Sequence, residues 1–471
     1  MQKKTLFSIA TIALIIFSFL IFTSEASSIN LSTKEKLDQY IENTAKKLAI
    51  PGMTVAISHN GELIYSEAFG KDVHQDTRFY IGSTSKTFTA LAVMQLVEQG
   101  NIDLDQSVTT YLQDFTVSDQ ITVRHLLQHI SGMTEFEFIS SLPEDAQFSD
   151  LLQDMNQMSL TYQPGEQFSY FNPNYSLLGA IIENTSGQSY IDYVENHIIQ
   201  PLGLQNTSLI GEVDTNGHLS FFGFSIKRTE PHIKYDLPAG FITSTAEDVV
   251  RFLEAIQMKD PVVGVSPEGI DEMTSSKSFY GMGLMIGEIA GRPAVFHGGA
   301  LPGYTSDAVI LTEDGYSIAY LINKNHLVNG FIFNPAITKG IVSILTEQEP
   351  PSNVNYFWIY RLLIILFAVT IVYNTIKIAK MISRPEQKSV KQRLTAAIVN
   401  LVIPIATFIA IPILAAMIMQ RGMTWELAFL LMPDMISWLF IALAIHLIQS
   451  VIHFAFIFKH YFNFKASTTK D

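Results

Sequence analysis

A series of long apolar segments near the C-terminus constrains this 471-residue sequence more than any other feature. The segments follow Pro350-Pro351 and cover about residues 357–376, 396–419 and 435–456. Each is long enough to cross a bilayer, which takes about 20 residues of α-helix. Within hydrocarbon, a single segment satisfies its backbone hydrogen bonds only as a helix. We therefore expect an all-α membrane region over residues 350–471, with the lipid bilayer as its partner.

The charged residues around these segments predict an orientation. Basic residues gather between the first two segments and after the third, at Lys377, Lys380, Arg384, Lys388, Lys391, Arg393, Lys459 and Lys465. The loop between the second and third segments balances Arg421 against Glu426 and Asp434. The positive-inside rule then places the first loop and the C-terminus in the cytoplasm, and the region before residue 350 outside it.

The N-terminus agrees with this orientation. Lys3 and Lys4 precede an apolar run over residues 6–22, and small residues follow at Ser24 and Ala26. This order is typical of a secretory signal peptide, and the run is also long enough for an uncleaved anchor. Both interpretations of residues 1–26 make residues 27–349 an extracellular domain of a multi-pass membrane protein.

The net charge of −14 is divided unevenly along the chain. Residues 351–471 contain 11 Lys and Arg against 4 Asp and Glu, a net charge of +7, which leaves −21 for residues 1–350. An acidic domain of this kind argues against nucleic acid as a partner.

The residue types also limit the cofactors that we expect. The sequence has no Cys, which excludes disulfides, thiol nucleophiles and thiolate metal sites. It has no His-Glu-x-x-His zinc motif. His446 and His453 share one face of the last apolar segment, where a metal or proton path is one interpretation and helix packing the plainer one. We predict neither a metal nor an organic cofactor.

The extracellular domain has helical patterns in its middle and strand patterns at both ends. Ser32 and Glu35 form a capping box for a first helix, and Asn60-Gly61 joins two strand-like runs into a hairpin. Further strand-like runs lie at residues 281–286, 292–296, 306–311 and 317–322. Helical runs lie between them at residues 121–128, 174–184 and 190–199, the last ended by Pro201. We expect an α+β domain whose single antiparallel sheet is assembled from both ends.

Ser83 and Lys86 lie at the start of an apolar helical run over residues 87–98. Because residues at i and i+3 share a helix face, the hydroxyl and the amine can meet. A buried amine can take the proton of a serine nucleophile, and N–H groups at a helix start favour the oxyanion that forms. Since Ser467 and Lys470 have the same spacing in a polar tail, the spacing counts only in the context of the buried helix.

Tyr170 and Asn172 form a second candidate motif, two residues apart on a loop before a helix. Both side chains can therefore point into one cleft. A phenol is a poor base with a pKa of about 10, but beside a protonated lysine it can relay a proton. Taken alone, Tyr170 would more often be a packing residue.

The run His297-Gly298-Gly299-Ala300 ends a predicted strand and forms the third motif. Adjacent glycines let a backbone approach a ligand closely. The Ala300 N–H, together with that of Ser83, would complete an oxyanion hole. His297 would contact a substrate carboxylate or amide, although a lone His is more often structural.

Together the three motifs resemble the serine β-lactamase and penicillin-binding-protein superfamily, and Tyr-x-Asn with His-Gly-Gly is similar to its class C β-lactamase and D-aminopeptidase branch. The resemblance covers about residues 31–345. Further matches are His129-Ile130-Ser131-Gly132, Pro201-Leu202-Gly203-Leu204, Pro238-Ala239-Gly240 and Tyr280-Gly281-Met282-Gly283. The resemblance implies a β-lactamase-like fold, with an antiparallel sheet flanked by helices and a helical subdomain.

The resemblance implies a serine hydrolase that acts through an acyl-enzyme on a small-molecule or peptide substrate with an amide or ester bond. Ser83 would be the nucleophile, Lys86 its activating base and Tyr170 the proton relay. Asn172 would hold the substrate amide, and residues 297–300 would line the oxyanion side. Because His297 stands where many β-lactamases have Lys, a peptidase or esterase is favoured over an efficient β-lactamase.

Three alternatives stay open. An extracellular domain followed by three spans also resembles the membrane peptidases that remove an N-acyl-D-asparagine cap from nonribosomal prodrugs. Those carry an acidic residue just before the nucleophilic helix, where this chain has Tyr80. A receptor that is acylated once and signals through the spans is the second alternative. The third is that the spans form a transport module. The sequence predicts no oligomeric state.

Overall fold

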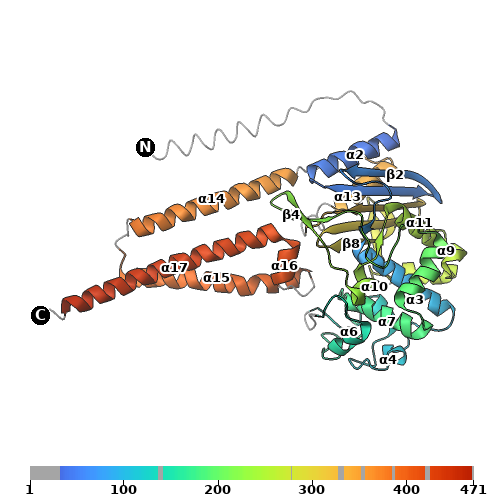
Figure 1. The fold of residues 1–471 in the computed structure, drawn as a ribbon, viewed down its shortest axis with the longest axis horizontal. Coiled ribbons are helices and arrows are strands. Elements are labelled where there is room, and N and C mark those ends of the chain that lie inside the picture. Colours follow the sequence, from blue (N-terminus) through green and yellow to red (C-terminus); the bar gives the residue numbers. More distant parts are fainter. Residues whose placement is uncertain are drawn as a thin grey trace.

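The computed structural model describes residues 32–135, 142–276, 278–326, 334–351, 356–383, 388–419 and 425–468. The expected targeting segment, residues 1–26, lies outside these ranges. A mixed α+β domain is followed by long helices that project from one side of it (Figure 1). The predicted class, an α+β domain with an antiparallel sheet followed by long C-terminal helices, is confirmed.

A six-stranded antiparallel sheet forms the centre of the domain. Its strands are β1 (Gly52–His59), β2 (Glu62–Gly70), β7 (Met285–Ile289), β8 (Arg292–Leu301), β9 (Tyr304–Leu311) and β10 (Tyr316–Ile322). Their order in the sheet is β2-β1-β10-β9-β8-β7. The first strand pairs with the last, from Met53 opposite Ile322 to His59 opposite Tyr316. The sheet is therefore assembled from both ends of the domain, as predicted.

The hairpin between β1 and β2 follows from its turn residues. Asn60 and Gly61 have φ angles of 52° and 85°. A tight two-residue hairpin requires this left-handed pair of conformations, and Asn-Gly adopts it at little cost. The turn sets the pairing of the strand that leads toward the candidate nucleophile.

Both faces of the sheet are covered, because successive residues of a strand point to opposite faces. Tyr320 of β10 belongs to the apolar cluster that includes α2 (Thr33–Lys47) and α13 (Asn334–Leu345). Its neighbour Leu321 belongs to the larger cluster that includes α11 (Ala246–Gln257). The larger cluster supports the site described below.

The remaining helices of the domain make the predicted helical subdomain, which lies beneath the sheet in Figure 1. They are α3 (Ser85–Glu98), α4 (Val108–Tyr111), α5 (Val123–Leu127), α6 (Phe148–Met155), α7 (Pro173–Ser186), α8 (Tyr190–Val194), α9 (Gln200–Leu202), α10 (Leu237–Gly240) and α12 (Pro267–Thr274). Almost every residue of α3 is buried. A helix enclosed on almost all sides needs no polar stripe, which explains why its apolar residues are not confined to one face.

Two predicted element boundaries are wrong. The strand expected at residues 281–286 begins only at Met285, because the Gly281 N–H donates to the Leu284 carbonyl at 2.8 Å and closes a turn. The helix expected to end at Pro201 continues through it. A π-helical turn over Glu195–Ile199 precedes α9, and Pro needs no hydrogen bond at the start of this last turn.

Three C-terminal helices are long and apolar enough to cross a membrane. They are α14 (Tyr356–Ser383), α15 (Val390–Met419) and α17 (Pro433–Thr468), with the short α16 (Trp425–Leu431) before the last. Many of their apolar side chains are exposed, among them Val369 and Ile409, each at 58%. Exposed apolar bands of this size suit a lipid environment. His446 of α17 hydrogen-bonds Asn400 of α15 at 2.9 Å, a packing contact between the two helices.

A hairpin that the sequence analysis did not anticipate joins the domain to these helices. Its strands are β4 (Gly217–Phe221) and β5 (Phe224–Arg228). At its tip, the Phe222 N–H donates to the Asp434 carboxylate of α17 at 2.9 Å. The Phe222 ring also stacks on Phe367 of α14, with centroids 5.1 Å apart. The domain therefore rests directly on the helix bundle.

Candidate active site

Ser83 lies on a single 3₁₀ turn, η1 (Gly82–Thr84), which runs directly into α3. The strand before the turn, β3 (Phe79–Tyr80), pairs with β6 (Thr243–Ser244). After the strand, the Ile81 N–H donates to the Ile242 carbonyl at 3.0 Å. Ser83 is half-buried, whereas the residues on either side of it are buried. The turn therefore presents one hydroxyl at the edge of an otherwise closed core.

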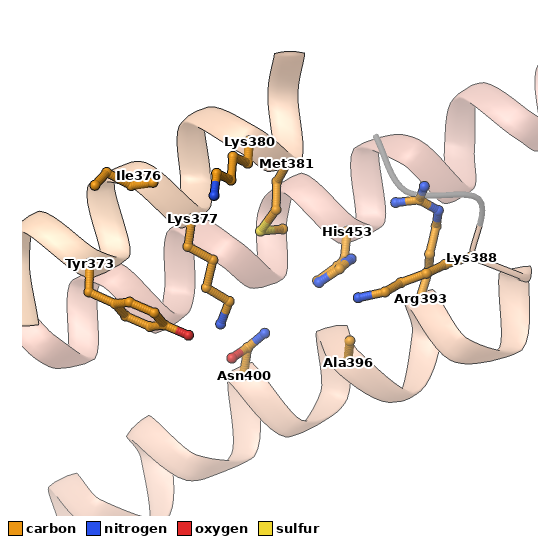
Figure 2. A pocket seen from close by; sticks show the side chains of 10 residues that line it. All are labelled: Tyr373, Ile376, Lys377, Lys380, Met381, Lys388, Arg393, Ala396, Asn400 and His453. Atoms are coloured by element: carbon orange, nitrogen blue, oxygen red, sulfur yellow. The ribbon is translucent and has the colours of Figure 1, made fainter. Parts of the chain in front are cut away.

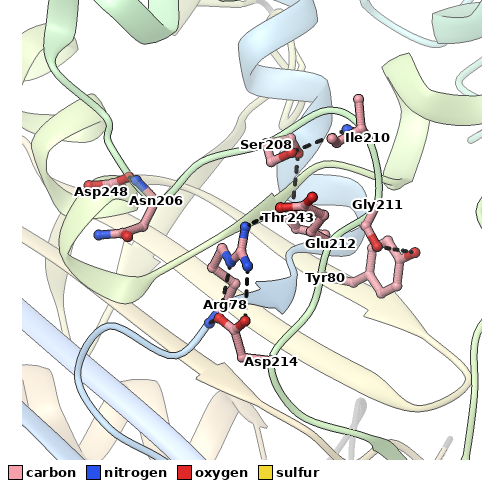
Figure 3. A network of polar contacts seen from close by, with 10 residues as sticks. All are labelled: Arg78, Tyr80, Asn206, Ser208, Ile210, Gly211, Glu212, Asp214, Thr243 and Asp248. Atoms are coloured by element: carbon pink, nitrogen blue, oxygen red, sulfur yellow. Dashed lines mark hydrogen bonds and ion pairs between the residues drawn. The ribbon is translucent and has the colours of Figure 1, made fainter.

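Arg78 fastens the start of this strand to a neighbouring loop (Figure 3). Its guanidinium donates to both oxygens of Asp214, at 3.0 and 2.9 Å, and to Glu212 at 2.7 Å. These hydrogen bonds lower the pKa of Asp214. A bidentate guanidinium–carboxylate pair fixes the relative orientation of the two side chains as well as their distance. The segment that leads into Ser83 is thereby held in place.

Tyr80 is part of the core beneath the nucleophile turn. It is 3% exposed, and its ring packs edge-on against Phe241 and Tyr304. Its hydroxyl donates to the Gly211 carbonyl at 3.3 Å (Figure 3). Burial, and secondarily the charges of Glu230 and Glu144, raise the pKa of Tyr80 to about 12. At this position the chain therefore has a buried neutral phenol.

Lys86 meets Ser83 across one turn, as the spacing predicts. Its Nζ lies 3.2 Å from Ser83 Oγ, 2.8 Å from Asn172 Oδ1 and 2.5 Å from the Ala239 carbonyl oxygen. The side chain is completely buried. The Asn172 and Ala239 oxygens can accept from the two N–H groups of a neutral amine, which leaves its lone pair for the Ser83 hydroxyl. The amine is therefore held at a defined point beside the hydroxyl.

Tyr170 brings its ring over the same amine. Lys86 Nζ lies 5.0 Å from the Tyr170 ring centroid and 5.6 Å from that of Tyr175. Tyr170 comes from the loop before α7, and Asn172 is the residue that precedes this helix. The structure thus brings four predicted residues, from two distant parts of the chain, to one point.

His129 shapes the loop that carries Tyr170, although the sequence analysis gave it no role. Its carbonyl accepts from the Ser169 N–H at 2.8 Å, and its Nδ1 accepts from the Phe171 N–H at 3.2 Å. Tyr170 therefore lies between two residues that are hydrogen-bonded to His129. The centroids of the Tyr170 and His129 rings lie 4.4 Å apart. Burial, and secondarily the charges of Lys86 and His297, lower the pKa of His129 well below its usual value. It is a neutral support for the loop.

His297 on β8 faces the protein interior. It is 2% exposed, its Nδ1 donates to the Gly298 carbonyl at 2.8 Å, and its Nε2 accepts from the Tyr280 hydroxyl at 3.0 Å. Burial, and secondarily the charge of Lys86, lower the pKa of His297 to about 3. The ring is therefore neutral and lies behind the site, 6.3 Å from the Tyr170 ring centroid. The imidazole that the sequence analysis expects to contact a substrate carboxylate or amide is thus enclosed by the protein.

The two glycines of the third motif explain how β8 reaches the nucleophile turn. A Cβ atom on Gly299 would overlap the Ile81 carbonyl oxygen, and one on Gly82 would lie 2.5 Å from the Ala300 nitrogen. Gly82 also has a φ of 51°, which disfavours other residues. Only glycine at both positions lets the two backbones touch. The backbone of Ala300 therefore lies beside the turn that carries Ser83.

The sequence model of the family described as Beta-lactamase matches residues 37–338 of this chain. The chain is similar to Protein flp of Staphylococcus aureus (strain MW2), at 25% identity over 380 residues, 71% of this chain and 74% of that protein. Among solved structures it resembles the octameric penicillin-binding protein homologue from Pyrococcus abyssi, with a TM-score of 0.60 and 27% identity, covering 70% of this chain and 81% of the other. It also resembles a D-stereospecific amidohydrolase from Streptomyces sp., with a TM-score of 0.54 and 25% identity, covering 62% and 94%. The chain therefore belongs to the beta-lactamase family of serine hydrolases.

Proposed function

We propose that this protein is a membrane-anchored serine hydrolase that cleaves an amide or ester bond outside the cytoplasm through an acyl-enzyme on Ser83. One observation supports the proposal above all others. The amine of Lys86, completely buried, lies 3.2 Å from the Ser83 hydroxyl in the first turn of a buried helix. A nucleophile and a base at hydrogen-bonding distance are the minimum requirement for catalysis through an acyl-enzyme.

In the proposed acylation step, Ser83 Oγ attacks the substrate carbonyl carbon and its proton passes to Lys86. The carbonyl oxygen becomes an oxyanion, for which the backbone N–H groups of Ser83 and Ala300 are the proposed donors. The C–N or C–O bond then breaks, and the leaving group takes a proton from Lys86 through the Tyr170 hydroxyl. Water, deprotonated along the same route, hydrolyses the ester on Ser83 and restores the hydroxyl.

Asn172 is the proposed substrate-orienting residue. Its Oδ1 accepts from Lys86 at 2.8 Å, which assigns the amide group so that the NH₂ end points away from the lysine. That end can donate to a carbonyl of an acylated substrate. One side chain would thus couple the position of the base to the position of the substrate.

The proposed substrate class is a peptide or amino-acid amide, with short esters as weaker substrates. This follows from the relatives, which include a penicillin-binding protein homologue and a D-stereospecific amidohydrolase. The neutral, enclosed His297 offers no cation for the carboxylate of a β-lactam. We therefore expect acylation by penicillins to exceed their turnover.

The test uses the full-length protein purified in detergent. Ser83→Ala should abolish labelling by a fluorescent penicillin or a fluorophosphonate, and Ser85→Ala, two residues along, serves as the control because Ser85 is wholly buried. Undiminished labelling of Ser83→Ala would remove Ser83 as the nucleophile. Screening D-amino-acid amides, nitrocefin and short-chain esters would then identify the leaving group.

A receptor that is acylated once is the second candidate, favoured by the direct contact between the domain and α17 through Asp434. Intact-mass measurements over time separate the two functions. A hydrolase returns to its unmodified mass while substrate is consumed. A receptor keeps the added acyl mass for as long as the protein is followed.

A further inference from the structure

A cavity of 380 Å³ lies between α14, α15 and α17, in the membrane helices and away from the candidate active site. Its polar lining residues are Lys377, Lys380, Lys388, Arg393, Asn400 and His453. We call it the basic cavity. None of its ten lining residues is acidic, and the other four are largely apolar. It is therefore a concave site with a basic part and an apolar part.

The basic side chains converge on the cavity from different helices. Figure 2 shows Lys377 of α14 and Lys388, just before α15, reaching inward from opposite walls, with His453 of α17 between them. Lys377 Nζ donates to Gln449 Oε1 at 2.8 Å, which holds this ammonium in place. The Arg393 guanidinium lies 4.6 Å above the Phe456 ring centroid and is held by that contact. Cationic side chains held in place in this way are preorganised to bind an anion.

The position of the basic cavity along the helices indicates the source of the anion. Lys377 and Lys380 lie in the last two turns of the candidate span Arg361–Ser383, and Arg393 lies in the first turn of the span Val390–Leu414. These are the helix ends that would meet the membrane–water boundary. The anionic groups concentrated at that depth are lipid phosphates, and basic pockets between spans bind such headgroups.

We propose that the basic cavity binds the phosphate headgroup of an anionic membrane phospholipid, with its acyl chains lying along the apolar part of the wall. Lys377 and Lys388 contact the phosphate from two sides, and Asn400 lines the cavity where a glycerol hydroxyl would lie. A soluble phosphate shares this chemistry but makes no use of the apolar wall. The assignment rests on the proposed membrane insertion of α14, α15 and α17.

The experiment uses the full-length protein in nanodiscs made from equal parts of phosphatidylcholine and phosphatidylglycerol. Native mass spectrometry then counts the lipids that stay bound. Wild-type protein should retain phosphatidylglycerol in preference to phosphatidylcholine. Lys377→Gln combined with Lys388→Gln should lower this retention about tenfold. Ala396→Phe keeps every charge but fills the cavity from its wall, and it should lower retention as well.

Lys459→Gln combined with Lys465→Gln is the matched control, because it removes the same charge from the same basic end of the bundle. The proposal is overturned if this control loses as much lipid as the cavity variants, or if Ala396→Phe retains lipid like the wild type. Displacement of the lipid by inorganic phosphate would assign the site to a soluble anion instead. Release of wild-type protein from membranes by alkaline carbonate would refute membrane insertion itself, independently of Ser83 labelling.

Discussion

The carboxylate of Asp434, at the start of α17, lies 3.0 Å from the imidazole Nε2 of His326, just beyond β10. The side chains are 2% and 0% exposed. The same carboxylate accepts from the Phe222 N–H at the tip of the β4–β5 hairpin. One acidic residue of the C-terminal helices therefore joins two separate segments of the α+β domain to the bundle.

Asp434→Ala should lower the stability of the full-length protein by about 3 kcal/mol, because removing one partner of a buried pair leaves the other without compensation. Thermal unfolding in detergent measures the change. Glu349→Gln, at an exposed position before the first span, is the control and should unfold like the wild type. An unchanged unfolding midpoint for Asp434→Ala would contradict the importance of this contact.

Tyr170→Phe should reduce turnover about 10²- to 10³-fold, since it removes the hydroxyl proposed to relay protons while keeping the ring over Lys86. The measurement is kcat and KM for an amide or ester that the wild type hydrolyses. The loss should fall on kcat and should alter its pH profile. Tyr162→Phe, on the chain segment before Tyr170, should leave both constants unchanged. A Tyr170→Phe enzyme with normal kcat would rule out the relay.

Gly299→Ala should abolish labelling at Ser83 and destabilise the domain by about 1–3 kcal/mol, because the new methyl group would overlap the Ile81 carbonyl oxygen. Gly287→Ala tests a glycine of the same sheet where the nearest atom would lie 3.7 Å away, at normal contact distance. That variant should label and unfold like the wild type. Equal behaviour of the two variants would show that the close approach of β8 is unnecessary.

Stability should fall in acid partly because of His297. Its pKa is about 3 in the folded protein and about 6.5 in an unfolded chain. Between these values the unfolded chain binds a proton that the folded protein does not. The free energy of unfolding therefore has its full value above pH 6.5 and decreases as the pH falls toward 3. At pH 5 the loss is about 2 kcal/mol.

His297→Gln should therefore lose less stability than the wild type between about pH 7.5 and pH 5. Urea unfolding at both pH values gives the comparison. His74→Gln, at an exposed position, should follow the wild-type pH dependence. A His297→Gln curve parallel to the wild type would show that the imidazole titrates normally in the folded protein.

The proposed topology can be tested with single cysteines, since the natural sequence has none. Lys71→Cys, exposed on the domain, should react with a membrane-impermeant maleimide in intact cells. Lys459→Cys, near the end of α17, should react only after the membrane is permeabilised. Labelling in the opposite order would show that the orientation predicted from the basic loop is wrong.

The parts of the fold that could be predicted depend on short-range rules. The i, i+3 spacing of Ser83 and Lys86 brings their side chains together without help from the rest of the chain. The Asn60-Gly61 turn likewise determines its own hairpin. Alternating apolar residues were sufficient to place strands at both ends of the domain, and hence to predict the α+β class.

The unpredicted parts depend on contacts between distant residues or on unusual local geometry. Ala239 offers only a backbone carbonyl to Lys86, which leaves no trace in the residue type. His129 supports the Tyr170 loop from a left-handed conformation, with φ of 55°, that is rare for His. The β4–β5 hairpin turns at Phe222 and Gly223, with φ of 48° and 83°, and Phe at the first position hides the usual turn signal.

The pairing of β1 with β10 determines when the sheet can form during synthesis of the chain. Until Ile322 has left the ribosome, Met53 and its neighbours have no strand to pair with on that side. Ser83 and Lys86 are synthesised early, whereas β8, whose backbone lies against the turn that carries Ser83, is among the last strands of the domain to be synthesised. Such late closure slows folding, because long loops must be ordered before their contacts form. A nascent chain therefore contains Ser83 and Lys86 well before the sheet beside them is complete.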